Sequence, residues 1–116
     1  MHFHLATVVA LFSSVLLTAC CGPYECRAAI EGREKYAPII SALESYKAEV
    51  GTYPQTLAQL VPTYIDAIPG QDSERRTEPE YARIDDSYIL GFQYFGPGSN
   101  SCHFSPENEW ECYGAN

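Results

Sequence analysis

The stretch YAPIISALESYKAEV, residues 36–50, continues through Gly51 into TYPQTLAQLVPTYIDAIP, residues 52–69, and decides the fold. At about 100° per residue, the large apolar residues of the first part fall into one helical stripe, which Lys47 alone interrupts. The stripe consists of Tyr36, Ile39, Ile40, Leu43, Tyr46 and Val50. Such a stripe predicts a helix that buries one face against the rest of the domain.

The helix is predicted to extend from about residue 23 to residue 50. Pro23 suits the first helical position, where its missing N–H costs nothing, and Gly51 suits a left-handed terminator. Pro38 removes one backbone hydrogen bond, so we expect a bend there. A break at Pro38, with an irregular segment before Tyr36, is the alternative.

A small sheet is predicted to cover the helix. A short helix at about 55–60 and a polar loop over 71–80 come first. Strands are then expected at 81–84, 87–95, 101–104 and 110–113, with a turn at Asp85-Asp86. Alternation places four residues of the second strand on one face, namely Tyr88, Leu90, Phe92 and Tyr94. The predicted fold class is therefore α+β, a long N-terminal helix packed on an antiparallel sheet of three to four strands over about 81–113.

The chain is short and acidic. Its 116 residues include 7 Lys and Arg and 15 Asp and Glu, for a formal net charge of -8. This length allows one small domain, expected over residues 20–116. A nucleic-acid partner is not expected, because phosphate binding needs a basic surface. An acidic surface would favour basic proteins or cations as partners, whereas the simpler interpretation, which we prefer, is that the charge only aids solubility.

Residues 1–19 are predicted to be a lipoprotein signal peptide. The apolar run FHLATVVALFSSVLLTA is too short and too polar for a transmembrane helix. It leads into Leu17-Thr18-Ala19-Cys20, which resembles the lipobox of bacterial lipoproteins, although MHFH at the start lacks Lys and Arg. The resemblance implies fatty acylation of Cys20, palmitate among the chains, and stable membrane attachment. Because Cys21 is not Asp, it also implies the periplasmic face of the outer membrane; a merely secreted protein is the alternative.

Four cysteines remain if Cys20 carries lipid, and their number indicates an oxidising compartment. Four cysteines allow three connectivities. We expect Cys102 to pair with Cys112, because both lie in the last strands with turn-forming residues between them. Cys21 and Cys26 would point apart on one helix, so they can pair only if Cys21 precedes the helix and folds back. Alternatively, one of them reaches the sheet or another chain.

Residues 36–95 resemble the globular part of type IV pilin-like proteins, most closely the major pseudopilin of type II secretion. The most specific matches are GTYP, residues 51–54, and the spacing LxPxYxxxIP over residues 60–69. Further matches are Ile39, Ala42, Leu43, Tyr46, Leu57, Tyr88, Leu90 and Phe92. The resemblance implies a long helix on a small antiparallel sheet and contacts with secretion or pilus proteins. The chain departs from the family in having charged residues such as Arg27 and Glu31 where pilins have a long hydrophobic helix.

No catalytic site, metal site or cofactor is predicted. His103 is the one histidine after residue 20, and it follows Cys102, which is assigned to a disulfide. No GxSxG, HExxH, P-loop or GxGxxG pattern occurs. The expected function is therefore non-enzymatic, a lipid-anchored envelope protein whose pilin-like domain contacts an unidentified envelope protein. The alternative is an acidic periplasmic inhibitor or binding module for a cationic protein such as a lysozyme.

Overall fold

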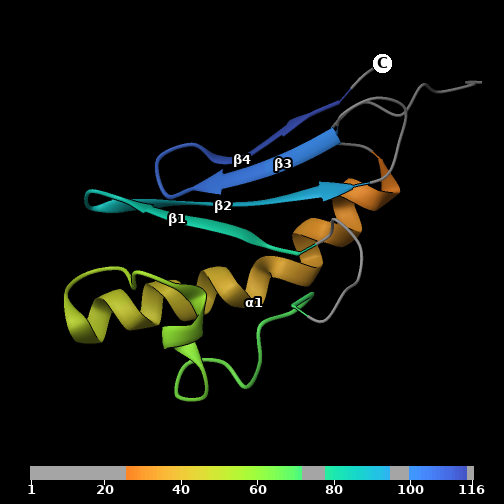
Figure 1. Ribbon diagram of the computed structural model, residues 1–116. Helices are drawn as coiled ribbons and strands as arrows, with labels where there is room; N and C mark the ends of the chain where they lie inside the picture. The colour runs from red at the N-terminus through yellow and green to blue at the C-terminus, as the bar shows by residue number, and fades with distance from the viewer. Residues whose placement is uncertain (1–25, 72–77, 95–99, 115–116) are drawn as a thin grey trace, which may run out of the picture.

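A computed structural model describes residues 26–71, 78–94 and 100–114. Within them, helix α1, Arg27–Val50, packs on one face of a four-stranded antiparallel sheet, as Figure 1 shows. The strands are neighbours in chain order: β1 (Glu80–Ile84), β2 (Ser87–Tyr94), β3 (Asn100–Ser105) and β4 (Glu109–Tyr113). A 3-10 helix, η1, spans Leu57–Leu60. The predicted α+β class, with one helix on a small antiparallel sheet, is confirmed.

The prediction that the helix begins near residue 23 is wrong. Cys26 has an extended backbone, with φ -61° and ψ 130°, and its carbonyl accepts a hydrogen bond from the N–H of Ile30 at 2.9 Å. Cys26 is therefore the N-cap, and Arg27 rather than Pro23 takes the first helical position. Residues 23–25 lie outside the described residues.

Gly51 determines where α1 ends, and Pro38 affects the course of the helix in its middle. Gly51 takes a left-handed conformation, with φ 95°, and its N–H bonds to the carbonyl of Lys47 at 2.8 Å. This cap ends the helix at Val50. Pro38 lies inside the helix, which continues through it without a break. In Figure 1 the first, orange turns of α1 run at an angle to the later, yellow turns, as an internal proline favours.

The buried face of α1 matches the predicted stripe in the middle of the helix but not at its end. Val50 is 54% exposed, so its assignment to the stripe is wrong. A helical wheel gives the direction of a side chain but not where the covering surface ends. Lys47 is accommodated because its Nζ lies 4.5 Å from the centroid of the Tyr53 ring, a cation–π distance. The buried residues of α1 are Ala29, Tyr36, Ile39, Ala42 and Leu43.

One face of the sheet covers α1 through aromatic side chains. On β2, the alternating residues Tyr88, Leu90, Phe92 and Tyr94 are all 9% exposed or less, as their pattern predicted. The ring centroid of Phe92 lies 5.2 Å from that of Tyr36 in α1 and 5.6 Å from that of Trp110 in β4. Large aromatic side chains bury much apolar area each, so the Tyr36–Phe92 contact holds α1 against the sheet, and Trp110 extends the aromatic cluster to β4.

The segment between α1 and the sheet closes one end of the core. Leu60 in η1 is fully buried, and Tyr53 is 4% exposed. The hydroxyl of Tyr81 donates to the carbonyl of Pro54 at 2.5 Å, and Nη1 of Arg83 donates to the carbonyl of Tyr53 at 3.2 Å. These two bonds join the segment to β1, an edge strand of the sheet.

Candidate functional site

The predicted disulfide between Cys102 and Cys112 is present. The two residues lie directly opposite each other in the β3–β4 pair, with Cα atoms 4.0 Å apart. Both sulfur atoms face the core, and Nη1 of Arg33 in α1 donates to Sγ of Cys112 at 3.3 Å. The bridge fixes the last strand to the sheet, and its role is structural.

Cys26 is also disulfide-bonded, and its partner lies outside the described residues, because Cys102 and Cys112 pair with each other. A bridge from Cys26 to the end of the sheet is therefore excluded. Cys20, the predicted lipidation site, and Cys21 lie outside the described residues as well. Because Cys26 precedes α1, the objection that Cys21 and Cys26 would point apart on one helix no longer holds. A local Cys21–Cys26 bridge stays a prediction.

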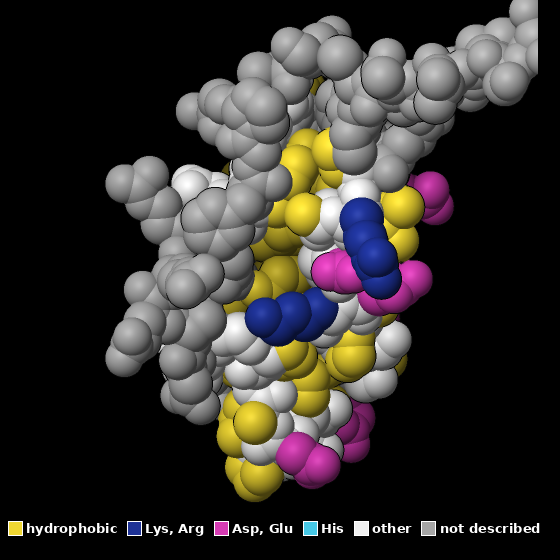
Figure 2. Space-filling model, turned by 90° about the vertical axis from the view of Figure 1, so that its right-hand side faces the viewer, with side chains coloured by type: hydrophobic (Ala, Val, Ile, Leu, Met, Phe, Trp, Pro, Cys, Tyr) yellow, Lys and Arg dark blue, Asp and Glu magenta, His cyan; other side chains and the backbone are white. Residues whose placement is uncertain are grey.

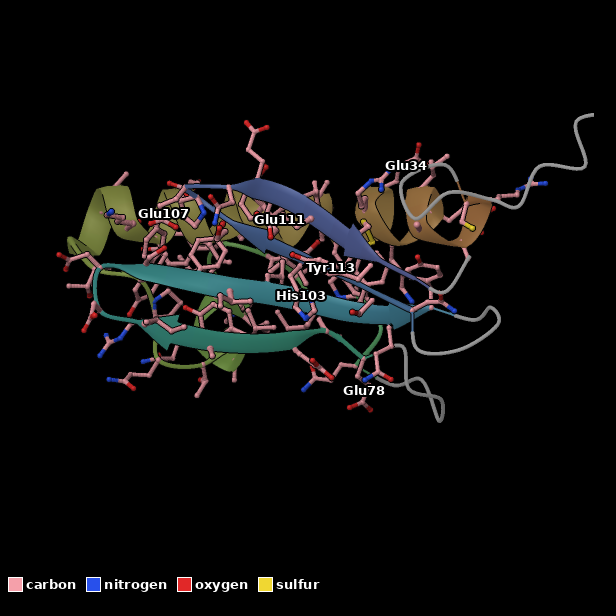
Figure 3. All side chains as sticks on the ribbon, turned by 90° about the horizontal axis from the view of Figure 1, so that it is seen from above. Glu34, Glu78, His103, Glu107, Glu111 and Tyr113 are labelled. Atoms are coloured by element: carbon pink, nitrogen blue, oxygen red, sulfur yellow. A yellow bond between two sulfur atoms is a disulfide. The ribbon has the colours of Figure 1, made fainter. Side chains whose placement is uncertain are left out.

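The face of the sheet turned away from α1 carries a hollow of about 640 Å³, which we call the outer hollow. The strand register places Ile84, Ile89, His103 and Tyr113 on this face, and we call these four residues its floor. Ile84 is 49% exposed, Ile89 39% and Tyr113 57%. Figure 3 looks onto this face and shows His103 and Tyr113 on neighbouring strands. Apolar surface is thus gathered on the sheet face that α1 does not cover.

His103 lies in the middle of the floor because Gly91 has no side chain. A Cβ added to Gly91 would lie 2.6 Å from Cδ2 of His103, so any larger residue at position 91 would displace the imidazole. The His103 ring centroid lies 6.4 Å from that of Tyr113, and Glu111 is its register partner in β4. The register therefore places an imidazole, a phenol and a carboxylate beside one another.

Five carboxylates line the outer hollow, and no Lys or Arg is among its lining residues. Ser87 donates its hydroxyl to Glu107 at 2.8 Å, and this hydrogen bond holds the pKa of Glu107 below its usual range. Tyr113 donates its hydroxyl to Glu111 at 2.7 Å. Figure 3 shows Glu111 on β4 and Glu107 nearer the turn between β3 and β4. We call the five the acidic rim: Asp85, Asp86, Glu107, Glu109 and Glu111.

Two residues of the acidic rim have a left-handed backbone, with φ 50° at Asp85 and 57° at Glu109. Aspartate suits such a position in a two-residue hairpin turn, which agrees with the turn predicted at Asp85-Asp86. Glutamate suits it less well, because its Cβ meets a steric cost that glycine avoids. Glu109 therefore presents its carboxylate on the rim at a cost in backbone energy.

Cys102 and His103 do not form a catalytic pair in this structure. Cys102 and His103 are neighbours in sequence, but they point to opposite faces of β3, and Cys102 is in a disulfide. They cannot act together as nucleophile and base in this state. In the described part of the chain, no group of three or more His, Cys, Asp or Glu is placed to hold a metal ion. The outer hollow offers shape, apolar surface and negative charge.

The end of the molecule at which α1 begins carries charges of both signs. Figure 2 views this end and shows basic and acidic side chains beside hydrophobic ones. Nε of Arg27 lies 2.8 Å from Oε1 of Glu31, one turn along α1, and both side chains are exposed. This end therefore lacks the single sign of charge that marks the outer hollow. Among residues 26–71, 78–94 and 100–114, no helix has the length and apolar character to cross a membrane.

Sequence reasoning missed the outer hollow, although two signals for it were present. Ile89 is an apolar residue that alternates with the predicted buried residues of β2, so it lies on the opposite face of the strand. Glu107, Glu109 and Glu111 alternate along the last hairpin, as side chains on one face of a sheet do. Comparisons with protein-family models, curated proteins and solved structures find no match to this chain.

Proposed function

We propose that this chain is a non-enzymatic, lipid-anchored protein of the bacterial cell envelope that binds another envelope protein through its outer hollow. The observation that carries the proposal is that the two faces of the sheet have different surroundings. One face packs on α1, whereas the other presents Ile84, Ile89 and Tyr113 to solvent around His103. Exposed apolar side chains that gather in one place mark interaction sites, whereas scattered ones are ordinary.

The proposed location depends on residues 1–20, and the proposed class of partner on residues 36–95. The lipobox-like Leu17-Thr18-Ala19-Cys20 supports attachment through Cys20 to the periplasmic face of the outer membrane. A helix packed on an antiparallel sheet is compatible with a pilin-like domain, as the GTYP segment suggests. The partner would then belong to a secretion or pilus machinery.

Site-specific photo-crosslinking tests the binding surface. A photoreactive residue at Ile89 in the full chain should form a discrete protein adduct in native cells. Ile30 on α1 is the matched control, because it is 38% exposed and Ile89 is 39% exposed. The same photoreactive residue at Ile30 should not form that adduct. No adduct from Ile89, or the same adducts from both positions, would contradict the proposal.

The anchor is tested separately by Cys20→Ser. The thiol is the acceptor of the lipid, so the variant should accumulate as an uncleaved precursor without fatty acid. Intact-mass measurement and membrane fractionation report the change. A variant with unchanged mass and unchanged fractionation would rule out the lipoprotein proposal.

An acidic inhibitor or binding module for a cationic protein such as a lysozyme is the second candidate function. The acidic rim favours it, because five carboxylates line the outer hollow without a Lys or Arg. The purified protein should then inhibit lysozyme at low salt and lose that effect as the salt concentration rises. A role in envelope assembly alone predicts no inhibition at either salt concentration.

A further inference from the structure

We infer that the outer hollow binds a basic peptide segment, with one apolar or aromatic side chain on its floor and Lys or Arg side chains against its acidic rim. The inference rests on the proposed function, because it names the class of partner for the same surface. Three features of the hollow carry it: its size, its apolar floor and the distribution of its charges.

The size of the outer hollow suits a segment of chain. A volume of about 640 Å³ lies within the range of ligand pockets, roughly 300–1,000 Å³. It holds a few side chains but not a folded domain. The partner would therefore enter with a loop, a tail or the end of a strand while the rest of it stays outside.

The floor offers an apolar place for one side chain of that segment. Ile84 and Ile89 come from β1 and β2, Tyr113 comes from β4, and His103 lies between them above Gly91. The exposed fractions of the two isoleucines and of Tyr113 leave this surface accessible. An apolar or aromatic side chain placed here would remove it from water.

The acidic rim decides the charge of the partner. Asp85 and Asp86 lie in the β1–β2 turn, Glu107 lies in the β3–β4 turn, and Glu109 and Glu111 lie in β4. The carboxylates are thus spread along the hollow, and no three of them are grouped to hold a metal ion within the described residues. Spaced carboxylates match spaced Lys and Arg side chains on a peptide. A second copy of this chain would bring two acidic rims together, and the resulting repulsion disfavours self-association at this face.

Peptide binding to the protein isolated from cells in a non-ionic detergent tests the inference. The probe is a labelled, end-blocked peptide of alternating Lys and Ser with one central Phe, followed by fluorescence anisotropy at low salt. The same peptide with Glu in place of Lys should not bind. If the Lys peptide does not bind, or binds no better than the Glu peptide, the inference is overturned.

Two triple variants with equal net charge separate the rim from the overall acidity. Glu107→Gln, Glu109→Gln and Glu111→Gln together remove rim carboxylates and keep side-chain size. Glu34→Gln, Asp66→Asn and Glu78→Gln together remove exposed carboxylates elsewhere, two of which Figure 3 shows away from the centre of the sheet face. Three exposed charge pairs change Kd by about threefold to about a hundredfold. The rim triple should weaken binding within that range and the control triple by less; equal losses would overturn the inference.

The floor is tested by Ile89→Ser against Ile30→Ser, two equally exposed isoleucines. Ile89→Ser should weaken binding of the Phe peptide but not of a version with Ser in place of Phe, and Ile30→Ser should change neither. Equal effects of the two variants would overturn the inference.

The combined results separate the inference from the proposed function. If Ile89 forms its adduct in cells while the two triple variants bind the peptide alike, the inference of a basic partner is wrong and the proposed function stands. If the triples differ but Ile89 gives no adduct, the proposed function alone fails.

Discussion

Gly32 in α1 lies so close to the ring of Phe92 in β2 that a Cβ on Gly32 would lie 2.1 Å from Cε2 of Phe92. Glycine in a helix usually costs about 1 kcal/mol relative to alanine, and the sequence alone therefore marks position 32 as a weak point. The structure reverses this interpretation. The missing side chain is what lets the Phe92 ring, which is 2% exposed, reach the helix.

Gly32→Ala should therefore destabilise the protein despite its better helix propensity. Overpacking a core costs about 1–3 kcal/mol, which exceeds the gain of about 1 kcal/mol from propensity. Urea unfolding measures the difference. Ala48→Gly, at an exposed position of the same helix, isolates propensity and should cost about 1 kcal/mol. A stabilised Gly32→Ala variant would show that Phe92 can move away without loss.

Most of the fold was predicted by apolar residues that recur at every second position in a strand or every three to four positions in a helix. The alternation of Tyr88, Leu90 and Phe92 gave the buried face of β2, and the helical spacing of Tyr36, Ile39 and Leu43 gave the buried face of α1. Each of these patterns reports the direction of a side chain from one element. What they could not give is where one element stops covering another. This is why Val50 is exposed against expectation.

The helix start and the outer hollow were missed for a related reason. Cys26 is the N-cap because of its backbone conformation, and no residue preference in the local sequence indicated that the helix begins after it. The hollow depends on the register of four strands, which brings Ile89, His103 and Tyr113 onto the face turned away from α1. Register is a relation between segments far apart in the sequence. The Cys102–Cys112 pair was predictable because the two residues flank a single hairpin turn.

Removing the Tyr88 hydroxyl should stabilise the protein. Tyr88 is 0% exposed, and its hydroxyl has no hydrogen-bond partner among the described residues. A buried polar group without a partner costs about 1–3 kcal/mol, so Tyr88→Phe should raise the free energy of unfolding by about 1 kcal/mol. Tyr53→Phe is the matched control: the Tyr53 hydroxyl donates to Glu44 at 2.9 Å, and its loss should cost about 0.5–1.5 kcal/mol. A destabilised Tyr88→Phe would mean that a buried water satisfies the hydroxyl.

Glu109→Gly should remove backbone strain from the acidic rim. With φ 57° at Glu109, a residue with a Cβ pays roughly 1–2 kcal/mol that glycine does not, while glycine pays about 0.5–1 kcal/mol of extra chain entropy. We expect a net stabilisation of up to about 1 kcal/mol in thermal or urea unfolding. Glu111→Gly, in the same strand but outside the positive-φ residues, should instead destabilise. Equal losses in the two variants would show that position 109 carries no strain.

The core tyrosines predict a loss of stability at alkaline pH. Burial, and next the hydrogen bond to Glu44, raise the pKa of Tyr53 to about 12, and burial raises that of Tyr81 to about 12 although Arg83 opposes it. In the unfolded chain both phenols titrate near 10. Because the folded-state pKa is the higher one, the stabilisation from the neutral phenols is complete below about pH 10 and is lost as the pH rises toward 12.

Urea unfolding at about pH 9 and about pH 11 should show this loss, and Tyr53→Phe should reduce it, since phenylalanine cannot ionise in either state. If Tyr53→Phe loses as much stability as the unmodified protein between these two pH values, then Tyr53 does not contribute to the alkaline transition.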